Sequence, residues 1–180
     1  AANLGTFYLC DASYDKALQA YETAQELAPG SYVGDEFLGM SHYFLGNLAE
    51  SARLCQRAIQ FIGDGRPEIH EIWGNFGDSC CQLGQTRQAV AAYLRAAEIA
   101  ERDHLRGTAP AADRAALAYY YVILGSMDKR LVPQDIERRL VSELDDIDAS
   151  VISGVVGFVE TEFGQGGGTA EDELGSLLLE

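Results

Sequence analysis

The chain has 180 residues, of which 28 are acidic and 13 are lysine or arginine, so that its formal net charge is −15 at pH 7. This length is typical of one domain, and a hydrophobic fraction of 47% is enough for a buried core. No apolar run in the sequence reaches the roughly 18 residues of a membrane span. Binding to DNA or RNA depends on basic side chains that neutralise phosphates, so the acidic balance argues against a nucleic-acid partner.

The negative charge is concentrated toward the C-terminal end. Residues 134–180 carry 12 acidic and 2 basic side chains, a net of −10, which leaves −5 for residues 1–133. A protein partner with neutral or basic segments fits such a surface. Charge that is retained only for solubility explains the pattern equally well.

The first predicted pair of helices lies at about residues 1–30. Within "LGTFYLCDASYDKALQAYETAQELAP" (4–29), apolar and small residues recur at three- and four-residue spacing, which is typical of helices that bury one face. The residues that define this pair are Leu4, Gly5, Tyr8, Ala17, Tyr21, Ala24 and Pro29.

Two further copies of this pattern follow, at about residues 35–62 and 70–103. A shift of 38 residues places "FLGMSHYFLGNLAESARLCQRAI" on "NFGDSCCQLGQTRQAVAAYLRAA", so that Gly39 aligns with Gly77. Self-similarity with a period of roughly 34 to 40 residues indicates a solenoid of stacked units. The second copy is the looser one, with Asp35 in the position where the third copy has tryptophan.

The third copy gives the clearest view of one unit. A run of helical spacing ends at Gly84, which turns the chain into a second helix. Small residues let the two helices approach closely, and one such pair cannot bury its own apolar face, so neighbouring pairs share a core. We therefore predict an all-α solenoid of antiparallel helix pairs. The facing residues of this unit are Trp73, Gly77 and Cys80 on the first helix, and Ala89, Tyr93 and Ala96 on the second.

The order of these slots resembles the tetratricopeptide repeat, although Glu101 stands where that repeat usually closes with proline. The resemblance covers residues 1–103. It implies a right-handed superhelical solenoid with about three regular repeats and irregular C-terminal helices. It also implies a non-catalytic module for protein–protein interaction, whose first helices line a concave groove. Residues 73–103 further resemble repeats attached to bacterial signalling proteins such as winged-helix regulators, kinases and cyclases, which suggests the repeat module of a larger regulatory protein.

The regular pattern fades beyond the third copy. Residues 111–163 predict degenerate helices, the first of which is expected to end at Leu124-Gly125. Residues 164–169 ("GQGGGT") are typical of a flexible linker, and they lack the lysine and serine or threonine of a phosphate loop. Residues 170–180 are acidic and then apolar, which predicts a C-terminal helix that docks on its own solenoid or on a neighbouring copy. A self-assembly scaffold or homodimer built through this segment is therefore the alternative function.

No group of side chains in the sequence points to catalysis, a cofactor or a metal site. Cys80 and Cys81 lack the second cysteine pair and the histidines of a zinc site, and Cys80 occupies a packing position, so burial is favoured over metal or redox chemistry. The three histidines are isolated, and none is placed for a catalytic triad. We therefore predict no enzyme activity and no cofactor. The chain shows neither an initiator methionine nor a signal peptide, and we interpret it as part of a longer protein, with the cytoplasm favoured.

The predicted binding surface is the groove lined by the first helices. Aromatic and methionine side chains beside carboxylates suit a peptide with apolar anchors and neutral to basic flanks. The alternative is that C-terminal elements cover this face, in which case the aromatic residues are simply core. Some proteins of the resembled family hold a C-terminal carboxylate with lysine, asparagine and arginine, whereas the matching positions here are Thr6, Met40, Asn75 and Asp78. The predicted groove residues are Glu36, Phe37, Met40, Tyr43, Phe44, Glu71, Asn75, Asp78, Gln82 and Tyr119.

Overall fold

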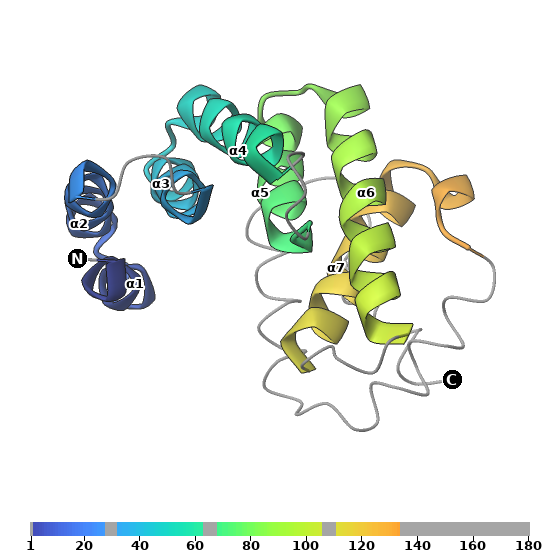
Figure 1. Cartoon of the computed structure of the whole chain (residues 1–180). Coiled ribbons are helices and arrows are strands. Elements are labelled where there is room, and N and C mark those ends of the chain that lie inside the picture. Colours follow the sequence, from blue (N-terminus) through green and yellow to red (C-terminus); the bar gives the residue numbers. More distant parts are fainter. Residues whose placement is uncertain (1, 28–31, 63–67, 106–110, 134–180) are drawn as a thin grey trace. The chain divides into compact units, whose positions relative to one another are not determined.

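The computed structural model describes residues 2–27, 32–62, 68–105 and 111–133 (Figure 1). These residues form α-helices and one short 3-10 helix, without a strand among them, which confirms the all-α fold class. No helix in this described part of the chain has the length and apolar character that crossing a membrane requires. The elements are α1 (Ala2–Cys10), α2 (Tyr14–Leu27), α3 (Tyr32–Phe44), α4 (Leu48–Ile62), α5 (His70–Gln82), α6 (Thr86–Leu105), α7 (Ala111–Met127) and η1 (Lys129–Leu131).

The chain divides into two units, Ala1–Ala96 and Ala97–Glu180. In the first unit, each of the helices α1 to α4 packs against the next helix along the chain. The first helices α3 and α5 also contact each other directly. The helices of the three hairpins are thus α1 and α2, α3 and α4, and α5 and α6.

The three hairpins turn by the same backbone geometry. The turns place Ala12, Gly46 and Gly84 at φ of 53°, 78° and 71°, in the left-handed region. At the last of these turns, the N–H of Gly84 donates to the carbonyl of Cys81 and that of Gln85 donates to the carbonyl of Cys80. The same two bonds recur at the other two turns, and they satisfy carbonyls that the end of a helix leaves without partners. The sequence analysis identified the turn at Gly84 but not the one at Ala12.

A glycine on the first helix receives a side chain of the second helix in each hairpin. A Cβ atom on Gly5 would lie 2.6 Å from the ring of Tyr21, and one on Gly77 would lie 2.8 Å from the ring of Tyr93. In the middle hairpin the corresponding contact is between Gly39 and the Sγ of Cys55, at 3.0 Å. The sequence analysis placed Gly77 opposite Ala89, Tyr93 and Ala96, and among these the ring of Tyr93 fills the space that the glycine leaves. The alanines Ala17, Ala89 and Ala96 are fully buried in the same interfaces.

The remaining repeat positions are less enclosed. Tyr8, Ala24 and Trp73 are half-buried, and Leu4 is 50% exposed. Pro29 lies outside the described residues, as do the helices predicted beyond residue 133, the linker at 164–169 and the segment 170–180.

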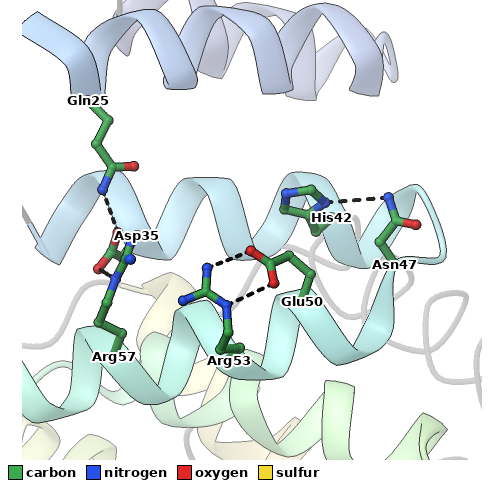
Figure 2. Close-up of polar contacts among 7 residues, drawn as sticks. All are labelled: Gln25, Asp35, His42, Asn47, Glu50, Arg53 and Arg57. Carbon is green, nitrogen blue, oxygen red and sulfur yellow. Dashed lines mark hydrogen bonds and ion pairs between the residues drawn. The ribbon is translucent and has the colours of Figure 1, made fainter.

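Polar bonds join neighbouring helices in the first unit, both within a hairpin and between hairpins. The carboxylate of Asp35, which is 1% exposed, accepts hydrogen bonds from Gln25 Nε2 at 2.6 Å and from Arg57 Nε at 2.6 Å. Figure 2 shows Gln25 reaching from α2, and Arg57 from α4, to this carboxylate near the start of α3. Between α4 and α5, the hydroxyls of Ser51 and Ser79 share a buried hydrogen bond of 2.8 Å.

The described part of the second unit consists of the end of α6, α7 and η1. Ile99 of α6 and Leu124 of α7 are both buried, and the hydroxyl of Tyr121 donates to Glu101 across 3.5 Å. Helix α7 continues to Met127, so the prediction that Leu124-Gly125 ends it is wrong. Among the described glycines, positive φ is found at Gly46 and Gly84, whereas the helical backbone at Gly125 lets the helix continue.

Candidate functional site

The predicted groove residues lie mainly on two first helices that touch. Helix α3 carries Glu36, Met40 and Tyr43 at spacings of four and three residues, which places them along one helix face. Helix α5 carries Glu71, Asn75, Asp78 and Gln82 in the same way. Because α3 and α5 pack against each other, the structure brings these two sets of residues into one unit.

Glu36 lies at the start of α3 and is affected by the acidic residue at the start of α5. Burial, together with the smaller effect of the negative charge of Glu71, raises the pKa of Glu36 to about 7. Glu36 is half-buried, whereas the side chain of Glu71 is largely exposed and lies 3.6 Å from Nε2 of His70. A partly dehydrated carboxyl group beside a second carboxylate is an environment that a cation would stabilise.

The aromatic side chains of α3 divide into two groups. Phe37 stacks on Tyr21 with ring centroids 5.0 Å apart, so it belongs to the packing between α2 and α3. Phe44 stacks on Tyr14 at 4.8 Å and meets Tyr43 edge to face at 5.6 Å. With 37% of its surface exposed, Phe44 leaves an aromatic surface open to a ligand.

The remaining groove residues of α5 differ in their accessibility. Asp78 is 8% exposed, and its Oδ1 accepts a 2.7 Å hydrogen bond from the hydroxyl of Tyr93. Asn75 is half-buried, and its backbone carbonyl accepts a hydrogen bond from Ser79 Oγ. Gln82 is exposed. Asp78 thus takes part in the packing of its own hairpin, a role that spacing alone did not indicate.

Tyr119 belongs to the second unit. It is a buried residue of α7, and its ring meets that of Tyr120 edge to face at 5.6 Å. Its membership of the groove stays a prediction.

The sequence analysis missed the acidic group that joins α3 to both α2 and α4. Asp35 was noted only as a departure in a position that usually holds tryptophan. A signal was present, because a charged residue at a core position requires a buried partner, but Arg57 lies 22 positions away and on another helix. Only the packing of α3 against α4 brings the two together.

The cysteines and histidines form no site for metal chemistry in the described residues, where no three or more metal-binding side chains cluster. Cys55 and Cys80 are buried, and burial raises the pKa of these thiols to about 12 and about 11 respectively. Burial also raises the pKa of the half-buried Cys81. His42 Nδ1 lies 3.4 Å from the side-chain amide of Asn47 at the α3–α4 turn (Figure 2).

Comparison with known families identifies one of the hairpins. Residues 70–103 match the family model described as tetratricopeptide repeat, and this stretch covers α5 and most of α6. Repeats of this family generally mediate protein–protein interactions and are typically not catalytic. No curated protein matches the chain.

Proposed function

Because residues 70–103 form a tetratricopeptide repeat, we propose that this chain is a non-catalytic interaction module that binds an extended peptide along α3 and α5. The segment that it binds carries apolar anchors and at least one basic side chain. On the resemblance of residues 73–103 to repeats of bacterial signalling proteins, we propose further that the module serves a larger regulatory protein.

The observation that carries this proposal is the direct contact of the first helices α3 and α5, which brings Glu36 near enough to Glu71 for the charge of Glu71 to raise the Glu36 pKa. Carboxylates that lie close together are destabilised by their mutual repulsion. A lysine or arginine placed between them would relieve that repulsion. Since Glu36 is half-buried, the attraction would be screened by solvent less than an interaction at a fully exposed site.

Apolar contacts with the peptide would come from the C-terminal end of α3. Met40 and Tyr43 follow Glu36 along one face of α3, and the ring of Phe44 is partly exposed beside them. Exposed aromatic side chains at a helix end supply apolar contact area with little loss of side-chain freedom. A peptide lying along α3 would therefore place its basic residue near Glu36 and its apolar residues near Tyr43 and Phe44.

The proposal is tested with a synthetic peptide that has two leucine anchors flanked by lysines, and with a second peptide in which glutamates replace the lysines. Isothermal titration calorimetry should detect binding of the lysine peptide only. Glu71→Lys should weaken this binding about tenfold, equivalent to about 1.4 kcal/mol, and should leave the helix content unchanged because Glu71 is exposed.

Glu22→Lys is the matched control, because Glu22 is an equally exposed acid on the second helix α2. Equal weakening by Glu71→Lys and Glu22→Lys would mean that only net charge attracts the peptide, and the groove assignment would be wrong. Asp78→Lys is unsuitable for this purpose, because its buried position makes loss of folding the expected result.

The self-assembly alternative rests on residues 170–180, which lie outside the described residues, and it stays a prediction. A concentration-dependent molecular mass that is lost on deleting residues 165–180 would favour it.

A further inference from the structure

The side chain of Glu36 is half-buried near the start of α3. Among the described residues, none donates a hydrogen bond to its carboxyl group or forms an ion pair with it. The preceding residue is different, because the carboxylate of Asp35 accepts hydrogen bonds from Gln25 and Arg57. Polar groups that a fold removes from water almost always have a hydrogen-bond partner, so Glu36 lacks what its neighbour has.

The repeat pattern has small residues at the position of Glu36. The glycine that the hairpins share aligns Glu36 with Ala2 of α1 and with Gly74 of α5, and Gly74 is buried. A glutamate at such a position loses hydration without gaining a partner, which lowers the stability of the fold. Packing between the helices therefore does not account for a carboxyl group here.

The titratable groups around Glu36 come from three helices. Its charge acts on Tyr21 of α2 and on Cys55 of α4. The carboxylate of Glu71 on α5 acts on Glu36 in turn, and Arg57 of α4 is already held in the ion pair described above. A hydroxyl, a thiol and a second carboxylate provide no positive charge. Burial and, to a smaller extent, the charge of Glu71 accordingly raise the pKa of Glu36 to about 7.

We propose that a basic side chain of the bound peptide exchanges for a proton on Glu36, so that the surface along α3 and α5 releases its peptide on acidification. This inference rests on the proposed function and adds control by pH to it. In the free protein under acidic conditions, the carboxyl group is protonated and neutral. When a lysine or arginine binds, the carboxyl group loses this proton to the buffer, and the carboxylate then accepts a charge-assisted hydrogen bond from the cation.

The direction of the effect follows from the form of Glu36 that binds. The cation pairs with the ionised form, which predominates in the free protein only above pH 7, since the pKa is about 7. At lower pH, the apparent affinity falls with the fraction of the carboxyl group that is ionised. This fraction decreases about tenfold between pH 8 and pH 6, so the dissociation constant should increase about tenfold. Unfolding does not compete with this effect, because protonation of Glu36 favours the folded protein.

Isothermal titration calorimetry of the full chain with the lysine peptide described above, at pH 6 and pH 8, tests the exchange. Titrations at pH 7 in two buffers with different enthalpies of ionisation count the protons released, and about half a proton per bound peptide is expected. Glu36→Gln should abolish both the proton release and the dependence on pH. At pH 8 this variant should bind the peptide about tenfold more weakly than the wild type or worse, because an amide carries no charge.

Two controls assign the effect to Glu36. Glu22→Gln should keep the full dependence on pH, because Glu22 is an exposed acid on α2. Histidine side chains also titrate in this range, and their protonation would weaken the binding of a basic peptide in the same direction. His42 and His70 lie on α3 and α5. A dependence on pH that persists in Glu36→Gln would therefore assign the effect to histidine and overturn the inference.

The remaining outcomes separate this inference from the proposed function. If the lysine peptide binds equally well at pH 6 and pH 8 and releases no proton, the exchange at Glu36 is wrong and the proposed function stands. If the peptide binds at neither pH, the proposed function is wrong and the inference fails with it.

Discussion

The ring of Tyr93 occupies the space that Gly77 leaves on the facing helix, and a Cβ atom at Gly77 would lie 2.8 Å from that ring. Both residues are buried, and the hydroxyl of Tyr93 is held by Asp78 at 2.7 Å. The ring therefore cannot move aside without losing a buried hydrogen bond. The glycine is required by packing, since the turn that needs positive φ lies seven residues later, at Gly84.

Gly77→Ala should therefore destabilise the protein by about 2 kcal/mol, a typical cost of overpacking a core, although alanine is intrinsically the better helix former. Urea denaturation monitored by circular dichroism measures the change. Gly34→Ala is the control, because a Cβ on Gly34 of α3 would lie 3.7 Å from Gln25, an ordinary contact distance. That substitution should be neutral or stabilising, and a similar loss at both glycines would refute the packing explanation.

The turn residue Ala12 is expected to be strained. Its φ of 53° lies in the left-handed region, where the two other turns have glycine, and an L-residue there costs about 1 kcal/mol. Ala12→Gly should accordingly raise the free energy of unfolding by up to about 1 kcal/mol. Ala91→Gly, at an exposed position inside α6, should lower it by about the same amount. In thermal denaturation, a higher melting temperature for Ala12→Gly and a lower one for Ala91→Gly would establish the strain at Ala12. A loss of stability in both variants would contradict it.

The ion pair between Asp35 and Arg57 should contribute more to stability than the pair between Glu50 and Arg53, although both lie on the α3–α4 hairpin (Figure 2). Arg57→Leu removes the cationic partner of a carboxylate that is fully buried, and we expect a cost of about 2–3 kcal/mol. Arg53→Leu opens a pair whose two side chains are about half exposed, and its cost should be below about 0.5 kcal/mol.

A double substitution separates the ion pair from simple packing. Asp35→Leu combined with Arg57→Leu should recover much of the lost stability, because no buried charge then lacks its partner. If chemical denaturation shows that the two losses simply add, the two side chains act independently and the interpretation of Asp35 as a brace between α3 and α4 is wrong.

The raised pKa of Glu36 makes stability depend on pH. The value rises from 4.5 to about 7 in the folded protein, so the fold disfavours the ionised form. Stability should fall as the pH rises from about 4.5 to about 7, by about 2–3 kcal/mol when its partial exposure is allowed for. Glu36→Gln should be more stable than the wild type at pH 8 and similar to it at pH 4.5, as urea titrations at the two pH values would show.

The groups around Glu36 allow the predicted dependence of stability on pH to be assigned to Glu36 itself. Its charge is also sensed by Tyr21 and Cys55, whose pKa values are raised above 10.0 and to about 12, so neither titrates between pH 4.5 and pH 8. Glu71→Gln removes the negative charge that acts on Glu36, and it should lower the carboxyl pKa measured by ¹³C NMR. An unchanged pKa of Glu36 would mean that the charge of Glu71 does not act on it, and the support for a shared cation site would be removed.

The spacing of small and aromatic residues was sufficient to predict the hairpins. Gly5, Gly39 and Gly77 recur with a companion at the same spacing on the next helix, a tyrosine in two hairpins and a cysteine in the middle one, and each companion fills the space beside its glycine in the structure. Such positions are predictable because helix geometry brings residues three and four apart to one face, and a short turn returns the chain along it. The turns at Gly46 and Gly84 could be predicted for the same local reason.

Contacts between hairpins could not be predicted in this way. Gln25 of α2 donates a hydrogen bond to Asp35 of α3, and the charge of Glu71 on α5 raises the pKa of Glu36 on α3. Asp78 was expected to face a ligand from its place on the helix, yet it is bonded to Tyr93 inside the hairpin. Spacing places a residue on a face, but burial and charge depend on what the neighbouring helix brings to that face.

The sequence by itself determined that this chain folds into paired helices and that one pair is a tetratricopeptide repeat, because both depend on local periodicity that any single unit carries. Only the tertiary structure decided which carboxyl groups are buried, which of them is affected by the charge of another, and which apolar side chains of α1 are exposed. These properties arise where one hairpin meets the next, between residues far apart in the chain, and there the free energy depends on the water and partners that each group loses or gains.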